Sequence, residues 1–600
     1  MGSVSREKNV DNKIGENVEL ANKLAIALGY DIVGKIARHV PSKVEEEDLS
    51  FRVVIPVDKY YEHPELGRIG IYLGIVDIKS LSVILSRVTG YDRRDFSSIL
   101  YNENDIPPPV VENEVYGTLI TNVIAKCEAL TKVEFNKIHE DEWDIEPADI
   151  VVEPQSPVFL PTSNVLEKLL SVKMGNLIIG ELEIPSSSKP LVSINPDDLN
   201  FHMLVIGTTG SGKTSFIKNL LFNNLRKISE EFQVFILDAT GDYYNVFLPP
   251  LHNKVESELK VTIAFPISKY EEFSNTSEIY ENYFSNMERI IQRYRDMGIN
   301  IRADLKGNEI YVEGELWKGH AKLYPFYLNF NRVKNMLHNL NPYLSEQGAR
   351  FLKFLVSKST AVTLEEFVEW LEGKGEKLIK EFKIHKETFS NIFRAVSTLN
   401  ETGLFDLNIE GLLGLDSIIS NSKNYLIFDL YNPEIDSFSQ KVLVHYILDK
   451  IFERKDKEFR GSEGRELKRT IIAIDEAHRF FPSNSIDEDI SFIRKVAGKL
   501  SMMMRLGRRR KMGFIFSTHD PRDLNEIVVE LANTKVIFRS DEKISRELGV
   551  PEQDSKLLRF SKSGVGVMLS PLLRQGMVWI KTPIPPLVGH YDESKDIKKS

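Results

Sequence analysis

The residues best suited to chemistry form a glycine-rich run, Gly207-Thr-Thr-Gly-Ser-Gly-Lys-Thr214, between an apolar run and an amphipathic helical pattern. This order of strand, loop and helix is the signature of a Walker A phosphate loop, in which backbone N–H groups converge on phosphates. We expect Lys213 to reach the β- and γ-phosphates and Thr214 to hold Mg²⁺. The expected nucleotide-binding residues are Gly207, Thr208, Thr209, Gly210, Ser211, Gly212, Lys213, Thr214 and Ser215.

A second apolar run, 470–474, ends in the adjacent acids Asp475 and Glu476. Such a pair is typical of a Walker B site, where the first carboxylate serves magnesium and the second polarises the attacking water. We assign Asp475 to the metal and Glu476 to the general base. Two solvated acids at a strand end are the alternative, which the phosphate loop disfavours. The pattern predicts turnover of ATP with Mg²⁺, rather than binding alone.

Three further polar residues follow expected strands. Asp238 follows the run 233–237 near the nucleotide edge of an open sheet, where it can support the metal, position Lys213, or cap a turn or helix. His519 follows the strand 514–516 and is a candidate γ-phosphate sensor, or a structural histidine. Arg539 ends the strand 533–538 and is a candidate finger or sensor.

A basic segment, 505–511, precedes the strand 514–516. An arginine from a neighbouring subunit can stabilise the transition state of phosphoryl transfer, and a basic cluster can also line a nucleic-acid channel. A solvated charge run at a helix end is the third interpretation. Arg505 and Arg508 lie three residues apart, so on a helix they share a face.

The pattern of apolar residues indicates which elements position these residues. Apolar strands at 203–206, 234–237, 425–428, 470–474 and 514–516 alternate with helical patterns, which predicts a parallel sheet with crossover helices. We expect this core to occupy 151–264 and 421–560. Helical periodicity predicts a helical insertion over 265–420, carried by the segments 277–297, 331–340, 345–358 and 364–382.

The N-terminal part contains short β-rich runs separated by turn residues, at 31–36, 51–56, 70–76 and 117–124. This spacing predicts a small β-barrel or sandwich over 26–150, with an irregular α+β module as the alternative. Residues 1–25 form a leader, and 140–161 is interpreted as a Pro-rich linker. The residues 561–600 are set apart as a C-terminal extension that ends in a frayed tail.

Composition restricts the class of protein. A length of 600 residues predicts several domains. The formal net charge is −10, so the chain as a whole is not basic. Binding of nucleic acid would therefore need a local basic patch or a basic channel. The single cysteine, Cys127, cannot form an intramolecular disulfide and is interpreted as a small buried apolar residue. With no targeting segment or long apolar window, we expect a cytoplasmic protein.

Taken together, the motifs resemble the HerA family of hexameric DNA-translocating ATPases, within the FtsK–HerA group of P-loop ATPases. The residues that carry the resemblance are 196–214, 237–243, 474–478, 505–509, 517–521 and 533–539. The resemblance implies an α/β fold. Its parts are a RecA-like core, an N-terminal β-barrel, an inserted helical bundle, and a C-terminal extension over 561–600 that braces a neighbouring subunit.

The resemblance also implies a ring of six subunits that threads double-stranded DNA, acts as a helicase or translocase, and works with a NurA-type nuclease in DNA end resection and repair. A neighbour's Arg505 or Arg508 would complete each ATP site. His519 stands where the family commonly has glutamine, and Asp242 where it has glutamate. These departures, the long leader and the large insertion suggest a paralogue of the standard archaeal protein.

Two other readings of function stay open. A ring ATPase of the same core could remodel protein, and a nucleotide-gated scaffold could recruit a nuclease or a defence effector. Stimulation of ATP hydrolysis by DNA distinguishes a DNA motor from both.

Overall fold

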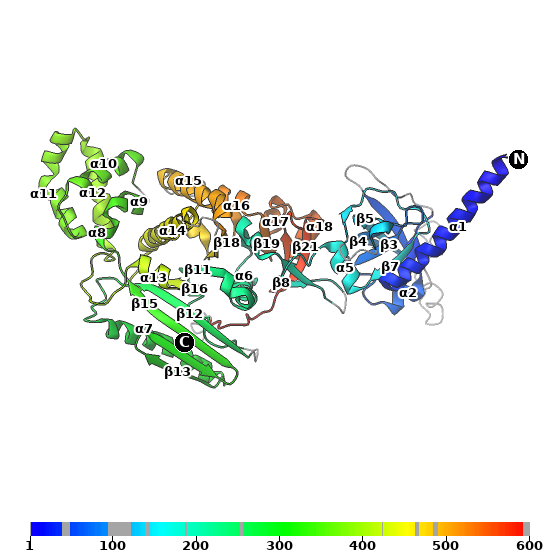
Figure 1. Ribbon diagram of the computed structural model, residues 1–600, viewed down its shortest axis with the longest axis horizontal. Helices are drawn as coiled ribbons and strands as arrows, with labels where there is room; N and C mark the ends of the chain where they lie inside the picture. Colours follow the sequence, from blue (N-terminus) through cyan, green and yellow to red (C-terminus); the bar gives the residue numbers. More distant parts are fainter. Residues whose placement is uncertain are drawn as a thin grey trace, which may run out of the picture. The chain divides into compact units, whose positions relative to one another are not determined.

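The computed structural model describes the chain from residue 2 to residue 591 (Figure 1). The internal exceptions are 39–41, 43–48, 94–121, 139–142, 186–188, 252–255, 342–343, 423, 462–466 and 484–489. The chain divides into two compact units, one of Met1–Ile194 with Leu569–Lys581 and one of Asn195–Met568 with Thr582–Ser600.

The first unit is built around a closed β-barrel. Its strands are β1 (Gly29–Ile36), β2 (Ser50–Ile55), β3 (Tyr72–Val76), β4 (Val83–Asp92), β5 (Val123–Val133) and β7 (Pro157–Pro161). They pair in the order β2-β1-β7-β3-β4-β5, and β5 returns to β2 to close the barrel. Alternate residues of β5 are buried, so Cys127 lies in the barrel core, as expected.

Other elements surround this barrel. The leader is a helix, α1 (Gly2–Leu28), which packs against β1 and β7. The short strand β6 (Glu146–Pro147) pairs with β5, and α5 (Ser163–Leu170) begins at Thr162, whose side chain accepts a hydrogen bond from the Val165 amide. Strands β21 (Met577–Lys581), β8 (Leu177–Leu182) and β9 (Leu191–Ile194) form an antiparallel ribbon within the same unit.

Two of the N-terminal expectations are wrong, and a third lies largely outside the described residues. Residues 140–161 are not a plain linker, because β7 lies between two barrel strands, and its prolines stand at the strand ends, where they are tolerated. Residues 151–194 and 569–581 belong to the barrel unit rather than to the core and the C-terminal extension. The expected strand at 117–124 lies largely outside the described residues, and β5 begins at Val123.

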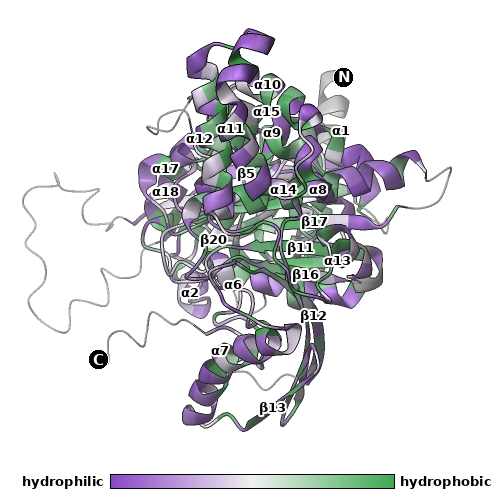
Figure 2. Ribbon diagram, turned by 90° about the vertical axis from the view of Figure 1, so that its left-hand side faces the viewer, coloured by the Kyte–Doolittle hydropathy of each residue, from purple (hydrophilic) through white to green (hydrophobic). Residues whose placement is uncertain are grey.

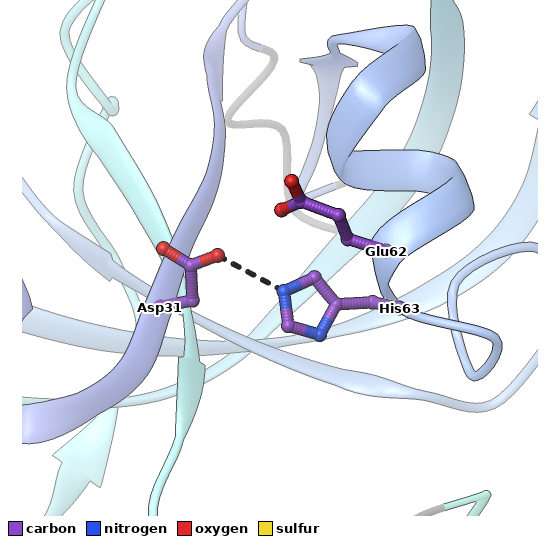
Figure 3. Close-up of side chains that lie close together, drawn as sticks. All are labelled: Asp31, Glu62 and His63. Atoms are coloured by element: carbon purple, nitrogen blue, oxygen red, sulfur yellow. Dashed lines mark hydrogen bonds and ion pairs between the residues drawn. The ribbon is translucent and has the colours of Figure 1, made fainter.

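A cluster of charged side chains ties α2 (Val57–Glu62) to β1 (Figure 3). His63 Nε2 lies 3.0 Å from Asp31 Oδ2. The Lys59 ammonium lies 2.8 Å from Asp31 Oδ2 and 2.8 Å from Glu62 Oε2. Lys59 lies between these two acids, so the cluster is an ion-pair network that holds the helix on the barrel.

The second unit contains a largely parallel sheet. Its strand order is β13-β14-β15-β12-β16-β11-β17-β18-β10-β19-β20. The central strands are β10 (Met203–Ile206), β11 (Phe232–Asp238), β16 (Tyr425–Asp429), β17 (Arg469–Ile474), β18 (Met512–Thr518) and β19 (Thr534–Phe538). They are apolar and buried almost throughout (Figure 2), as expected of central parallel strands. The parallel core predicted from sequence is thus confirmed, and β18 lies between the phosphate-loop strand and the Walker B strand.

The region 265–420 differs from a purely helical insertion. Strand β12 (Ser257–Pro266) extends the core sheet, and β13 (Ile301–Lys306), β14 (Glu309–Gly314) and β15 (Trp317–Phe326) follow as further strands. Residues 307–308 form the two-residue β13–β14 turn, with Gly307 at φ 61°.

Helix α7 lies along the added strands, the helices α8 to α12 form a separate group, and α13 lies beside the core sheet (Figure 1). They are α7 (Thr276–Asp296), α8 (Phe330–Val333), α9 (Leu337–Leu340), α10 (Glu346–Lys358), α11 (Leu364–Phe382), α12 (Lys386–Glu401) and α13 (Leu415–Asn421).

The remaining helices of the second unit connect the core strands. They are α6 (Lys213–Lys218), α14 (Ser437–Arg460), α15 (Ile490–Gly507), α16 (Glu526–Leu531), α17 (Glu542–Glu547) and α18 (Glu552–Leu558), followed by β20 (Val565–Leu569). Helix α6 continues as a π-helical turn over Asn219–Asn224. Among the helices in the described parts of the chain, none has an apolar stretch long enough for a membrane span.

The C-terminal segment 582–590 packs along α6 of its own chain. Fully buried Lys218 donates hydrogen bonds to Gly589 O and His590 Nδ1, each at 3.1 Å. Asn219 donates to Pro583 O at 3.1 Å and accepts from the Leu587 amide at 2.8 Å. The bracing of a neighbour by 561–600 stays a prediction, whereas these contacts anchor the segment in cis.

Candidate nucleotide site

The phosphate loop joins β10 to α6. Gly210 (φ 72°) and Gly212 (φ 112°) adopt left-handed conformations that favour glycine, which lets the loop turn back over the helix N-terminus. The Lys213 ammonium donates to Gly207 O at 2.8 Å and to His519 Nδ1 at 3.0 Å. Burial lowers the pKa of Lys213, and the nearby acids Glu476 and Asp475 oppose this shift. A buried ammonium held among acceptors suits a multiply charged phosphate.

The two acids lie where β17 ends, beside the phosphate loop. Asp475 Oδ2 lies 3.4 Å from Thr214 Oγ1 and accepts from Tyr243 OH at 3.0 Å. Asp475 Oδ1 accepts hydrogen bonds from Ser517 Oγ and, at 3.0 Å, from the Glu476 amide. A hydroxyl and an oriented carboxylate side by side are the oxygen ligands that Mg²⁺ prefers, so the expected pair of Thr214 and Asp475 fits the metal.

Glu476 is held in an unusual conformation. Its backbone is left-handed (φ 47°), and its amide is fixed by Asp475 Oδ1 and by Ser517 Oγ at 3.2 Å. Burial, reinforced by the negative charge of Asp475, raises the pKa of Glu476 to about 7. Its buried Oε2 accepts no hydrogen bond within the described residues and lies 3.5 Å from His478 Nδ1. A carboxylate with this pKa and a free lone pair can accept a proton near neutral pH.

His519 lies between the lysine and the glutamate. Its Nε2 is 2.9 Å from Glu476 Oε1, and its Nδ1 is 3.0 Å from the Lys213 ammonium and 3.2 Å from Gly207 O. Because Nδ1 accepts from an ammonium, the proton of a neutral imidazole is on Nε2, where it donates to Glu476. Burial and the positive charge of Lys213 lower the pKa of His519, which favours this neutral form.

Asp238 caps the turn that follows β11. Its buried carboxylate accepts hydrogen bonds from the amides of Gly241, Asp242, Tyr243 and Tyr244, at 2.7 to 3.2 Å. This is the turn-capping alternative noted from the sequence. By ordering the turn, Asp238 brings the hydroxyl of Tyr243 to Asp475. Burial and the neighbouring Asp242 raise the pKa of Asp238 to about 6.

The basic segment lies at the opposite edge of the sheet from this site. Arg508 is exposed and stacks on Phe201, with its guanidinium carbon 4.2 Å from the ring centroid, and Arg505 is also exposed. Both precede β18, whose other end carries His519, and its seven residues span about 20 Å. Buried Arg510 pairs with Asp456 and anchors the segment to α14.

The remaining predicted residues lie along the loop. The backbone of Arg539 accepts from the Thr208 amide at 2.9 Å, so this arginine stands beside the loop of its own chain. Thr208, Thr209 and Gly210 are exposed, whereas Ser211 and Ser215 are buried. Ser211 Oγ has no hydrogen-bond partner within the described residues, as expected of a hydroxyl beside a ligand site.

Sequence reasoning did not identify Ser517, Tyr243 and His478 as site residues. Ser517 and Tyr243 both hydrogen-bond Asp475, and His478 lies beside Glu476. All three lie within the motif segments 237–243, 474–478 and 517–521, at strand ends on the edge that carries the site in open α/β sheets, but no role had been assigned to them.

A phosphate loop and a glutamate-bearing strand, with one strand of the same parallel sheet between them, place the chain among the P-loop ATPases. Residues 173–451 match the family described as "Helicase HerA, central domain". This part of the chain is therefore similar to the central domain of HerA helicases.

Two curated relatives match over most of their length. One is a probable helicase of Methanocaldococcus jannaschii, 23% identical over 80% of this chain and 82% of the relative. The other is the DNA double-strand break repair helicase HerA of Pyrococcus furiosus, 19% identical over 86% of this chain and 84% of the relative. A solved structure of the bacterial conjugative coupling protein TrwB is 12% identical, covers 66% of this chain and 89% of its own, and has a TM-score of 0.40.

Proposed function

We propose that this protein is an ATP-driven helicase or translocase of double-stranded DNA that works as a homo-oligomeric ring, with six subunits as in the family it resembles. The match of 173–451 to the HerA central domain and the name of the Pyrococcus relative support a role on DNA and in its repair. A NurA-type nuclease, or an analogous effector, is the proposed partner.

The position of the exposed arginines carries this proposal. Arg505 and Arg508 lie at the sheet edge opposite to Lys213 and Glu476, so they cannot serve the ATP site of their own chain. Phosphoryl transfer gains most when a cation reaches the terminal phosphate in the transition state. A neighbouring copy in a ring can supply that cation, which couples hydrolysis to assembly.

The chemistry follows from the residues at the site. Lys213 leaves Gly207 O and His519 to bind the terminal phosphates, and the loop amides bind the rest. Thr214 and Asp475 would hold Mg²⁺, which would supply positive charge to the phosphates. Tyr243 and Ser517 hold the Asp475 carboxylate in place.

Glu476 orients a water molecule for attack on the γ-phosphorus. The water's proton goes to Glu476 Oε2, the oxygen that accepts no hydrogen bond, while the bond between the γ-phosphorus and the ADP oxygen breaks. His519 fixes the other carboxylate oxygen through its Nε2–H. The buried site keeps the base at a pKa near neutrality.

The decisive experiment measures steady-state ATP hydrolysis of the full chain with and without linear double-stranded DNA at low salt. Strong stimulation that Glu476→Gln abolishes supports the DNA motor. Robust hydrolysis that DNA leaves unchanged overturns it and favours a protein-remodelling ring. Slow, DNA-independent hydrolysis with ATP-dependent capture of a partner overturns it in favour of the nucleotide-gated scaffold.

A further inference from the structure

A short turn after α18 lies directly against the phosphate loop. Ser563 Oγ donates to Gly210 O at 2.7 Å, and the Gly564 amide donates to Ser211 O at 2.9 Å. Gly564 is left-handed (φ 81°), as this close approach of two backbones requires. The turn 559–564 is therefore fixed to the loop that faces the phosphates.

This turn lies on the side of the loop away from the catalytic acids. Strand β10 has β18 and then β17 on one side, with Asp475 and Glu476, and β19 and β20 on the other. A terminal phosphate must point toward Glu476 to react, so the nucleoside of the same nucleotide leaves the loop on the side of β19 and β20. The turn 559–564 leads into β20 on that side.

The turn presents an exposed aromatic ring. Phe560 is 80% exposed, the largest fraction among the big apolar side chains of the described residues. The Arg559 guanidinium carbon lies 5.7 Å from the ring centroid. Phe560 is three residues from Ser563, so their Cα atoms lie at most about 11 Å apart. The ring is thus within reach of a base whose phosphates occupy the loop.

An apolar side chain lines the path between ring and loop. Ile584 is 42% exposed, and its Cδ1 lies 3.1 Å from the position that a Cβ on Gly212 would take. It also contacts Gly564, so the C-terminal segment and the turn together form one wall beside the phosphate loop.

We propose that Phe560, backed by Arg559, is the platform on which the base of the bound nucleotide stacks, with Ile584 against the sugar. The proposal rests on the proposed ATP site and adds the element that holds the base. Stacking on an aromatic face accepts every base, because each has a π-face. Adenine and guanine nucleotides should therefore bind within about tenfold of each other.

The test compares two ligands that share phosphates and differ in the base. Binding of MgATP and of magnesium tripolyphosphate to the full-length Glu476→Gln protein is measured by calorimetry, with and without Phe560→Ala. We expect the alanine to weaken ATP about tenfold and to leave tripolyphosphate unchanged. Phe560→Trp should keep ATP affinity, and its added fluorescence should respond to ATP but not to tripolyphosphate.

The neighbouring Leu557, 49% exposed, supplies the matched control, and Leu557→Ala should leave both affinities unchanged. Equal loss of both ligands in Phe560→Ala, or no loss of ATP, would overturn the base platform. A change in oligomeric state without selective loss of ATP would overturn it in favour of a subunit contact. If the Glu476→Gln parent binds neither ligand, the proposed ATP site itself fails, which is a distinct result.

Discussion

His519 Nε2 lies 2.9 Å from Glu476 Oε1, so the imidazole holds one oxygen of the glutamate that we propose as the base. Its other nitrogen accepts from the Lys213 ammonium. The histidine thereby links the group that would bind the terminal phosphate to the group that would activate water.

Replacing His519 by alanine should shift the pH dependence of hydrolysis. A hydrogen bond to a carboxylate favours its ionised form, so loss of the Nε2–H donor raises the pKa of Glu476 above about 7. We expect the acidic limb of kcat/KM to move to higher pH by about one unit in His519→Ala. His519→Gln keeps an N–H donor and should move the limb back. An unshifted limb in the alanine variant would contradict the positioning role.

Glu476→Gln should lower kcat by about 10² to 10⁴-fold while ATP binding persists. The amide cannot take the proton from water, whereas Lys213 and the loop amides are unchanged. Single-turnover hydrolysis and calorimetric binding separate the two effects. A parallel loss of binding and turnover would indicate that Glu476 organises the loop instead.

The same substitution should stabilise the fold at alkaline pH. The pKa of Glu476 in the folded protein, about 7, lies above its ordinary value of 4.5. The folded state therefore binds this proton more tightly, and stability falls as pH rises from 4.5 through 7. Glutamine does not ionise, so its stability does not fall in this pH range. Glu476→Gln should therefore have a free energy of unfolding about 1 to 3 kcal/mol higher than the parent at pH 8, and no advantage below about pH 4.5. Denaturant titrations at both pH values give the comparison, and an equal difference at each would exclude the titration of Glu476 as its cause.

Asn219→Ala should destabilise the second unit by about 1 to 3 kcal/mol, because Pro583 O and the Leu587 amide lose their partner. Asn223, on the same π-helical turn, bonds only its neighbour Asn224 among the contacts described, and Asn223→Ala should cost less than about 0.5 kcal/mol. Thermal denaturation of the two variants measures the anchoring of the C-terminal segment. Equal shifts in the melting temperature of the two variants would refute the anchoring role of Asn219.

Arg505→Ala and Arg508→Ala should identify the arginine that acts in trans. The correct variant should lose about 10³-fold in kcat with ATP binding intact, whereas Arg509→Ala, equally exposed and adjacent, should lose little. Mixing that variant with Glu476→Gln should restore activity, because the second chain donates the arginine that the first lacks. No recovery in rings shown to be mixed would argue against action in trans.

The phosphate loop, the Walker B acids and the parallel core were predictable because their signals are local. Each motif needs an apolar strand next to a few residues of defined type, and those residues are contiguous in the sequence. The hairpin of β13 and β14 had a readable signal as well, a Gly307-Asn308 turn between alternating apolar residues.

The strand β7 was missed for a physical reason. Its five residues begin and end with proline and follow an acidic segment, a composition typical of a linker. Its place between β1 and β3 depends on residues more than 80 positions away, and a pattern within the segment carries no information about them.

By itself, the sequence determined that this chain has a phosphate loop, a Walker B pair and a parallel sheet to hold them, because chain neighbours specify each of these. The tertiary structure alone decided that Tyr243 and Ser517 meet at Asp475, that His519 joins Lys213 to Glu476, and that Arg505 and Arg508 lie at the far edge of the sheet. Strand order and strand direction set those distances, and they arise from packing between segments that are 42 to 306 residues apart.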